Sequence, residues 1–597
     1  MRVSQGEWAA KSLDDGRWRF GLWAPDAGEV HLELGDDRHG AQALPGGWWQ
    51  VEAPGEAGDV YCWSLDGTCY PDPAAFAQAG DVHGASRLVD HRAYAWQHPW
   101  PGRAWHEAVV YELHIGTFTK QGTFAAAAAA LPRLARLGVT FIEIMPVAQF
   151  DGARGWGYDG VLPFAPHPAY GTPDDLRALV DAAHGLGIGV LLDVVYNHFG
   201  PSGNYLAAWC PSFFHADRAS PWGQGIAFEQ EAVRRYFIAN ALHWLEDYRM
   251  DGLRLDAVHA IGDASPEHFL DELGAAIRRA FAGRQVHLVT EDERNLAHYF
   301  EPEAPYDATW NDDWHHAIHC LLTGEDESYY APFARDPVGD LATALADGYV
   351  EQGQARPGGE GGDGEAPCGE PPSGEPPRGE PSAHLPRSAF VNFLGNHDQV
   401  GNRARGERLH HLVEDAHALR VVTALTLLAP FVPMLFMGDE FLTEAPFLFF
   451  ADFGGELGEA VRKGRAREFA KFSAFGGEVP DPIARETFEA SRIGGAETQA
   501  QKAHEAFVGD LIALRRDHVV PLLAASSQPI CAVERDGDFL AVTWTFATQK
   551  LGIAVRLGSE GPEPARREDA FLDLRAEGSP FVFSAFVEAA GEVGGCA

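Results

Sequence analysis

Four separated segments of this 597-residue chain each pass from an apolar run into acids, histidines or asparagines. They are LLDVVYNHFG (191–200), DGLRLDAVHA (251–260), HLVTEDERN (287–295) and FVNFLGNHDQVGNR (390–403). Each begins with the Val, Leu, Ile or Phe of a buried β-strand and ends in side chains that can carry chemistry. The carboxyl ends of parallel barrel strands converge on one face, where the loops build the active site. Packing alone does not explain four such ends in order, and together they predict one site that cleaves a glycosidic bond.

Asp256 is the predicted nucleophile of that site. Hydrolysis of a glycosidic bond needs a carboxylic acid that protonates the leaving oxygen and a carboxylate that faces the anomeric carbon. Alternation along the strand sends Arg254 and Asp256 to the same side of DGLRLD, into the barrel mouth. A guanidinium two residues away favours the ionised carboxylate that attack requires. A purely structural Arg–Asp pair is the alternative, since structural ion pairs also place charges in this way.

Glu291 is the predicted general acid, and Asp398 is the third acid of the site. Glu291 follows a strand, where burial beside apolar neighbours can keep a carboxyl protonated near neutral pH. Asp292 and Glu293 follow at once, so spacing alone does not choose among the three. The strand-end position favours Glu291, and helix capping is the alternative role for Asp292. Asp398 lies beside His397, and such a carboxylate can bind sugar hydroxyls more tightly as positive charge develops on the sugar ring. A role as a turn or helix-cap residue is the alternative for Asp398.

Two further groups of residues are predicted to bind substrate. Asp193, Asn197 and His198 end one of the strands. A hard cation takes about six to eight oxygen ligands, which the sequence does not offer here, so we expect neither a metal nor a cofactor. We interpret His198 as a hydrogen-bond partner of the sugar and Asp193 as a supporting or purely structural group. Trp156 and Tyr158 lie on a Gly-rich loop, where an aromatic side chain either stacks on a sugar ring or packs in the core.

The elements that must position these residues alternate between strand and helix from about residue 105. A helix is expected at 123–137, where six alanines favour helix formation, another from about Pro173, and a third within 229–250. The expected strands and strand ends lie at 108–116, 139–147, 187–195, 251–256, 287–293, 309–312, 393–396 and 434–440. Eight strands alternating with helices predict an α/β protein with a central (β/α)8 TIM barrel.

The barrel is expected to span 96–512, between two β-rich regions. Short strands separated by Gly, Asp and Pro predict a glucan-binding-like β-sandwich at 1–95, whose last part, 71–90, has the composition of a linker. Strand-like segments predict a C-terminal antiparallel β-domain at 513–597. Residues 351–387 are rich in Pro, Gly, Glu and Ser and cannot bury enough apolar surface to fold, so we expect a disordered insertion within the barrel.

Composition and charge limit the partners. Hydrophobic residues make up 46% of the chain, enough for a large buried core, and the formal net charge is −40. Nucleic acids and anionic membranes repel such an acidic chain, whereas a neutral sugar does not. The seven cysteines are odd in number and lack metal-type spacing, which favours reduced thiols over a Cys62–Cys69 bridge. With no apolar signal core and no run of about 18 apolar residues, we expect a cytoplasmic protein.

The four segments resemble the four short regions shared by the α-amylase superfamily of glycoside hydrolases, and the likeness runs from about residue 105 to 510. The resemblance implies Asp256 as nucleophile, Glu291 as acid/base and Asp398 as transition-state stabiliser. It also implies a set of residues that line the cleavage subsite, namely Tyr158, His198, Arg254 and His397.

Other motifs narrow this resemblance. FGLWAP and VVYELHIGTF are similar to the branch that holds branching enzymes, isoamylases and trehalohydrolases. Similarity to the maltooligosyltrehalose trehalohydrolase family rests on WGYDGV (156–161), WNDDWHH (310–316), NHDQVGNR (396–403), APFLFF (445–450), GRAREF (464–469) and PDPIARETFEASRI (480–493). The resemblance implies cleavage of the α-1,4 bond next to the terminal trehalose unit of maltooligosyltrehalose, an α-1,4-glucan. It further implies a functional partnership with a maltooligosyltrehalose synthase.

Selection of trehalose is expected in the loop 154–160, in WNDDWHH, which contains Asp312 and Trp314, and after Glu440. Gly395 stands where relatives tend to carry a side-chain amide, which affects subsite affinity rather than the acids. A glucan branching enzyme or an isoamylase-type debranching enzyme is the enzymatic alternative, because the sequence does not show whether water reaches a covalent intermediate first. An inactive glucan-binding barrel is the non-enzymatic alternative. It predicts loss of an acid, and all three are present.

Overall fold

The predicted barrel is present and closed in the computed structural model, which describes residues 7–220, 223–354, 378–469 and 479–590. Its eight strands form one ring in chain order, with every neighbouring pair parallel. The strands are β10 (Val110–Leu113), β11 (Phe141–Ile144), β14 (Gly189–Val194), β17 (Gly252–Leu255), β18 (His287–Thr290), β19 (Ala308–Trp310), β20 (Phe390–Phe393) and β21 (Val432–Phe436). Because all strands run the same way, the predicted acids at their carboxyl ends face one end of the barrel.

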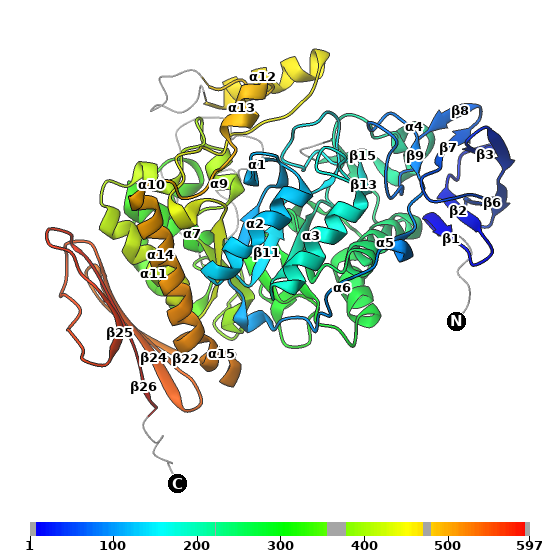
Figure 1. Ribbon diagram of the computed structural model, residues 1–597. Coiled ribbons are helices and arrows are strands. Elements are labelled where there is room, and N and C mark those ends of the chain that lie inside the picture. Colours follow the sequence, from blue (N-terminus) through cyan, green and yellow to red (C-terminus); the bar gives the residue numbers. More distant parts are fainter. Residues whose placement is uncertain (1–6, 221–222, 355–377, 470–478, 591–597) are drawn as a thin grey trace, which may run out of the picture.

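Helices cover the outside of this barrel (Figure 1). Helix α2 (Phe124–Leu137) begins after Thr123, whose side chain accepts a hydrogen bond from the backbone of Ala126, and ends at Gly138 with a φ of 101°. That left-handed conformation suits glycine, which stops the helix before the next strand. The other large helices of the barrel are α3 (Pro173–Gly185), α5 (Glu231–Asp247), α6 (Phe269–Ala280), α7 (Asp312–Thr323), α8 (Pro337–Asp347) and α11 (Ala416–Leu428).

The barrel interior has an apolar layer directly below a charged one. Val110, Phe141 and Leu191 belong to one buried apolar cluster. The residues two positions further along the same strands are Glu112, Glu143 and Asp193, which are also buried. Since residues two apart in a strand point the same way, the sequence itself places a layer of buried carboxyl groups on an apolar layer.

Two antiparallel sheets form the N-terminal sandwich. One has the order β1–β2–β6–β5, and the other the order β4–β3–β7–β8 with β9 beside β7. Their bounds are β1 (Ala9–Ser12), β2 (Arg17–Trp23), β3 (Val30–Leu34), β4 (Asp37–Gly40), β5 (Gln42–Leu44), β6 (Trp48–Pro54), β7 (Val60–Leu65), β8 (Thr68–Tyr70) and β9 (Ser86–Arg87). Phe20 lies between the sheets, edge to face with Tyr61 at 5.2 Å and with Trp63 at 6.4 Å.

The segment 71–90 is not the open linker that its composition suggests. Its residues 71–78 are buried. Asp72 accepts a hydrogen bond from the Tyr61 hydroxyl at 2.8 Å, and Tyr236 of α5 donates to the Pro73 carbonyl at 2.6 Å. The expectation is wrong because the segment is packed between the sandwich and α5, where its polar groups find partners.

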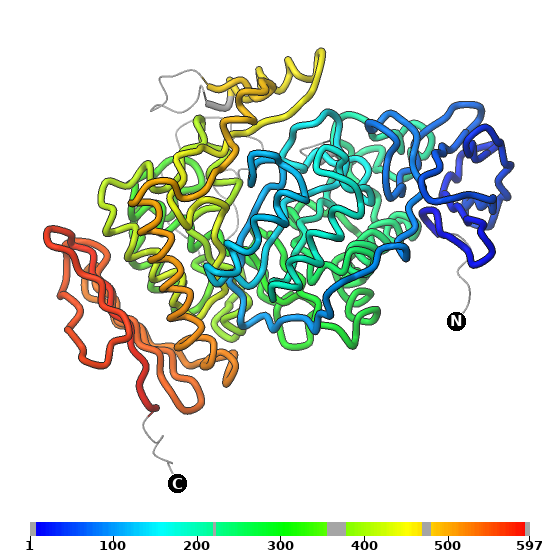
Figure 2. Tube along the Cα trace, viewed as in Figure 1, coloured from blue at the N-terminus to red at the C-terminus, as the bar shows by residue number. Residues whose placement is uncertain are grey.

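The C-terminal sheet is antiparallel, in the order β22–β23–β24–β26–β25. Its strands are β22 (Ile530–Asp536), β23 (Phe539–Thr545), β24 (Gln549–Leu557), β25 (Ala570–Leu574) and β26 (Phe581–Ala589). Helices α14 (Gln499–Leu514) and α15 (Val520–Ala525) precede it, so the sheet begins later than residue 513. The N-terminal sandwich and the C-terminal sheet lie at opposite ends of the molecule, with the barrel between them, as Figures 1 and 2 show.

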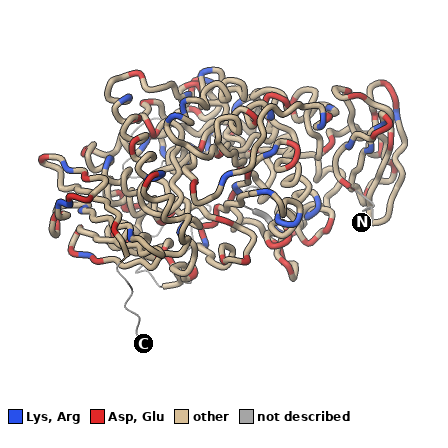
Figure 3. Tube along the Cα trace, turned by 60° about the horizontal axis from the view of Figure 1, so that its bottom comes forward, with Lys and Arg blue, Asp and Glu red and all other residues tan. Residues whose placement is uncertain are grey.

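The predicted insertion 351–387 falls largely on residues 355–377, which lie outside the described residues. At its described ends, Arg378 forms an ion pair with Glu351. Acidic positions occur in the barrel and in both terminal sheets (Figure 3), in keeping with the net charge of −40. Among the described helices, none has both the length and the apolar composition needed to cross a membrane.

The described cysteines form no disulfide bond with one another. Cys62 and Cys69 lie on the paired strands β7 and β8 without a bond between them.

Candidate active site

Arg254 on β17 is the centre of the site. Its guanidinium donates to Asp193 at 2.6 Å and to Asp256 at 3.0 Å through one nitrogen, and to Glu291 at 2.6 Å through another. The Arg254 side chain is fully buried and lies over the ring of Trp310, 3.9 Å from its centroid. A single guanidinium therefore gathers carboxylates from three neighbouring strands, β14, β17 and β18, at the barrel mouth.

Asp256 is held at both oxygens. Arg254 donates to Oδ1, and the Asn197 amide donates to Oδ2 at 2.8 Å and to the Asp256 carbonyl at 2.7 Å. The next residue, Ala257, has a φ of 39° and a ψ of 53°, so the chain turns away sharply after the strand. The Asp256 side chain is 12% exposed. The carboxylate is thus fixed in orientation and still partly exposed.

Glu291 is arranged as a carboxyl that holds its proton. Its Oε2 accepts from Arg254 and, at 3.0 Å, from the backbone N–H of Ala257. Burial raises the pKa of Glu291 well above its usual range, and the charges of Asp256 and Asp398 raise it further, against the opposing effect of Arg254. A carboxyl with a raised pKa beside an ionised one is the pairing that acid catalysis of glycoside cleavage needs.

Asp398 lies at the start of the short helix α9 (His397–Gly401). The Asn396 side chain caps this helix by accepting from the backbone N–H of Asp398 at 2.8 Å. The Asp398 side chain is 38% exposed, and its Oδ1 lies 3.4 Å from Nε2 of His397. Although burial alone would raise the pKa of Asp398, the charge and hydrogen bond of His397 lower it. Asp398 is therefore an ionised group that is open to solvent at the mouth of the barrel.

Tyr158 and His397 form a stacked pair beside these acids. Their rings lie 5.0 Å apart at 20°. The Tyr158 hydroxyl donates to Asp193 at 2.6 Å, and burial raises the pKa of Asp193 to about 6. This arrangement anchors the Tyr158 ring through Asp193 and Arg254.

Asp312 adds a fifth carboxyl to Asp193, Asp256, Glu291 and Asp398. It is the first residue of α7, and its Oδ1 accepts from the Gln399 amide at 3.1 Å. Burial, followed by the charge of Asp398, raises the pKa of Asp312 to about 7. Its charge also acts on Glu291, so Asp312 belongs to the same electrostatic cluster.

Comparisons with known proteins fit this geometry. Residues 95–212 match the family model of the alpha amylase catalytic domain. The malto-oligosyltrehalose trehalohydrolase of Deinococcus radiodurans is 43% identical over 91% of this chain and 88% of its own length. Those of Rhizobium sp. (strain M-11) and Saccharolobus solfataricus are 40% and 37% identical, over 90% and 81% of this chain and 90% and 82% of their own. The chain belongs to the malto-oligosyltrehalose trehalohydrolase family.

One solved structure shares the fold over nearly the whole chain. A crystal structure from Salmonella typhimurium, assigned there to an alpha amylase, has a TM-score of 0.91 and 44% identity over 98% of this chain and 100% of its own. A branching enzyme of Rhodospirillum rubrum is 35% identical, but the match covers 40% of this chain and 37% of its own. Membership in the trehalohydrolase family therefore extends over nearly the whole chain, and the likeness to branching enzymes does not.

Most of the residues predicted for the site lie together in this trehalohydrolase fold. Hydrogen bonds, ring contacts and charges join Asp256, Glu291, Asp398, Arg254, Asp193, Tyr158, His397 and Asp312. His198 is close to them, since it contacts the Asn197 side chain and interacts with the charge of Asp256. Burial lowers the pKa of His198, so it is an uncharged hydrogen-bonding group.

Two predicted tryptophans are buried, Trp314 between helices and Trp156 behind the ring of His397. Trp314 is fully buried on α7 and donates to Thr426 of α11 at 3.3 Å, so the expectation that it contacts substrate is wrong. Its ring packs between helices because it lies two positions after Asp312, on another face of α7. Trp156 is 7% exposed, donates to the Leu448 carbonyl at 3.0 Å and stacks on Phe447, so it packs in the core instead of presenting a sugar platform.

Sequence reasoning missed several residues that hold the site. Asn197 was noted without a role, and Glu112, Trp310 and Gln399 were not singled out. Glu112 is a charged residue within the apolar run VVYELHIG. An acid on the inward face of a barrel strand is a signal that could have found it. Trp310 and Gln399 carry no comparable signal for the site, because Trp310 meets Arg254 of β17 and Gln399 meets Asp312 of α7 only in the folded barrel.

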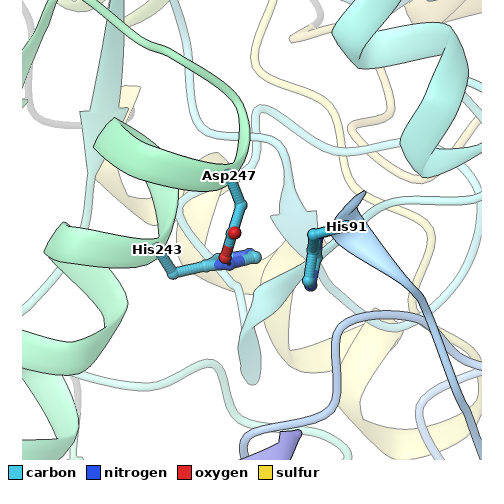
Figure 4. A group of neighbouring side chains, drawn as sticks. All are labelled: His91, His243 and Asp247. Carbon is cyan, nitrogen blue, oxygen red and sulfur yellow. Dashed lines mark hydrogen bonds and ion pairs between the residues drawn. The ribbon is translucent and has the colours of Figure 1, made fainter. Parts of the chain in front are cut away.

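Among the described residues, one group of three could hold a metal ion by proximity: His91, His243 and Asp247 (Figure 4). His243 contacts Asp247 at 2.7 Å through Nδ1 and the Phe164 carbonyl at 3.1 Å through Nε2. The guanidinium of Arg177 donates to Nδ1 of His91. A cationic side chain bound to one of the three opposes a metal. Arg177 also donates to the backbone carbonyl of Asp247 at 3.2 Å, so it links the segment near His91 to α5.

Proposed function

We propose that this chain is a retaining glycoside hydrolase that cleaves the α-1,4 bond next to the terminal trehalose unit of maltooligosyltrehalose and releases trehalose. The main observation behind the proposal is that Asp256 and Glu291 both accept hydrogen bonds from the Arg254 guanidinium at the mouth of a closed barrel. The family to which the chain belongs supports the choice of substrate.

In this mechanism Asp256 attacks the anomeric carbon while Glu291 gives its proton to the glycosidic oxygen, so trehalose leaves as a neutral alcohol. A glycosyl ester then joins the sugar to Asp256. Ester formation removes the negative charge that helps to raise the pKa of Glu291. Glu291 can therefore accept a proton from the water that hydrolyses the ester, and both carboxyls return to their starting states with retention of configuration.

The remaining cleft residues are assigned to substrate binding. Tyr158 supplies an aromatic face, and Asp398 holds hydroxyls of the sugar whose ring flattens in the transition state. Asp312, the loop 154–160 and the segment after Glu440 are proposed to contact the trehalose leaving group. Such a substrate has to come from an enzyme that joins the end of a maltooligosaccharide through an α,α-1,1 bond, a maltooligosyltrehalose synthase. We place both in the cytoplasm, where free thiols persist.

Product analysis tests the proposal. Incubation with maltooligosyltrehalose is expected to give free trehalose and a shortened maltooligosaccharide, with a newly formed α-anomer visible by NMR before mutarotation. New α-1,6 branch points without trehalose would show a branching enzyme instead. Unchanged substrate bound to the protein would show an inactive glucan-binding barrel. The matched control is the Asp256→Asn variant, in which product should be lost while glucan binding persists.

A further inference from the structure

Glu112 is a buried acid in β10, the first barrel strand. Its Oε1 lies 2.5 Å from Nδ1 of His397, and its Oε2 accepts from the His397 backbone N–H at 3.1 Å. Both side chains are 1% exposed. Glu112 therefore uses both of its oxygens on a single residue that lies 285 positions later in the chain.

The other ring nitrogen of His397 faces a second carboxylate. Nε2 lies 3.4 Å from Oδ1 of Asp398. Ionised carboxylates only accept hydrogen bonds, so an imidazole between two of them satisfies both when each ring nitrogen carries a proton. Aromatic rings enclose this imidazole, with Tyr158 stacked on it at 5.0 Å and Trp156 edge to face at 5.5 Å. Such faces also favour a cation.

The charges around His397 favour the protonated ring. Burial alone would lower the pKa of His397, but Asp398 and Glu112 raise it well above its ordinary value. Two further titratable groups near it are uncharged. Burial raises the pKa of Glu143 on β11 well above its usual range, and burial lowers the pKa of His114 to about 3.

We propose that Glu112 is a positioning residue for glycoside cleavage, holding His397 as an imidazolium that keeps Asp398 ionised and directed at the sugar. The role of Asp398 rests on the proposed function, whereas the Glu112–His397 pairing does not depend on any substrate. A neutral His397 would leave Asp398 partly buried without a counter-charge, and a protonated Asp398 cannot stabilise the positive charge that develops on the sugar.

The first test measures the protonation of His397 in the unmodified protein. Selective ¹⁵N labelling of histidine, with the His397→Asn variant to assign the signal, reports both ring nitrogens by NMR. We expect both to carry protons throughout pH 6 to 8. A singly protonated His397 at pH 7 would overturn the proposal, and it would do so whether or not the protein releases trehalose.

The second test is Glu112→Gln, which keeps the shape and removes the charge. Loss of a negative partner lowers the pKa of His397, so the ring loses its extra proton at a lower pH. We expect kcat to fall roughly a hundredfold at pH 7 with KM within about threefold, and the alkaline limb of the pH profile to move to lower pH.

The matched control is Glu143→Gln. Glu143 is the residue paired with Glu112 across β10 and β11, and it is already uncharged, so its pH profile should stay in place. An equal shift in both variants would mean that any buried amide disturbs the barrel, and the specific role of Glu112 would fall. If the unmodified protein released no trehalose yet showed a doubly protonated His397, the proposed function would fail and the pairing would stand.

Discussion

Two aspartates flank the strand β17, and their surroundings differ. Asp251, before the strand, accepts from the Trp100 indole at 2.6 Å, from His184 at 2.8 Å and from the backbone of Val190 at 2.9 Å. Its side chain is 1% exposed. Asp256, after the strand, is 12% exposed at the cleft.

The difference shows what separates a structural acid from a reactive one on the same strand. At the amino end of β17, called the closed end here, hydrogen-bond donors from several elements surround Asp251 and hold the base of the barrel together. At the carboxyl end, called the open end, Arg254 and Asn197 orient Asp256 and leave it accessible. Glu291 accepts a hydrogen bond from the same Arg254 guanidinium. Burial with fixed partners serves stability at one end, whereas orientation together with access serves chemistry at the other.

The Asp256→Asn variant should show the functional difference between the two ends of β17 most clearly. We expect trehalose release to fall at least about a thousandfold, because an amide cannot form the glycosyl ester. The thermal midpoint should fall by no more than about 5 °C. The amide oxygen can keep the Asn197 contact while the amide nitrogen faces the Arg254 donor, and the partly exposed position makes this loss smaller than at the buried Asp251. A variant that kept more than about a tenth of the original rate would show that Asp256 is not the nucleophile.

Glu291→Gln is expected to lower the rate on maltooligosyltrehalose by about 10²- to 10⁴-fold, the range for loss of a general acid. A glycoside with a good leaving group should lose much less at the first step, because it needs no protonation. Since the raised pKa of Glu291 keeps the acid protonated, the proton of Glu291 and the activity that depends on it should be lost as pH rises through that pKa. The pH–rate profile of the variant should lack the Glu291 contribution and keep only the one from His397, so an alkaline limb identical to that of the unmodified protein would show that Glu291 is not the acid.

Asp251→Asn tests the closed end. The amide nitrogen of the variant would face hydrogen-bond donors that now bind a carboxylate oxygen, and two donors cannot bond to each other. We therefore expect a loss of about 2–3 kcal/mol in the free energy of unfolding. The rate per folded molecule should stay within about twofold. Urea denaturation followed by fluorescence, with activity measured well below the transition, checks both. A large loss of kcat with unchanged stability would erase the contrast between the ends.

The variants Trp314→Phe and Tyr158→Phe have the smallest expected effects, and they compare a residue buried between helices with one at the site. Trp314 is buried between helices, so its replacement should cost about 1 kcal/mol of stability and leave the ratio of kcat/KM for maltooligosyltrehalose and plain maltooligosaccharide unchanged. Tyr158→Phe removes the hydroxyl that donates to Asp193 and should lower kcat/KM by about three- to tenfold. If Trp314→Phe changed the substrate ratio instead, the distinction between barrel wall and cleft would be wrong.

Much of the barrel could be predicted because its signals are local. The apolar runs, such as HLVT before Glu291, mark strands, and the polar residues that follow mark their ends. The errors also have local causes. Asp312 and Trp314 lie two residues apart on α7, and a helix does not present such residues on one face. The segment 71–90 lacks periodicity because its burial depends on two separate parts of the molecule.

The sequence by itself determined the order of strands and helices, the three acids at strand ends and the placing of Arg254 and Asp256 on one side of β17, because alternation and strand boundaries depend only on near neighbours. Only the tertiary structure decided which oxygens share the Arg254 guanidinium, that Asn197 holds Asp256, and that Glu112 from the first strand meets His397 after the seventh. Those contacts depend on how a closed ring of parallel strands is staggered, and no local pattern in the chain specifies that stagger.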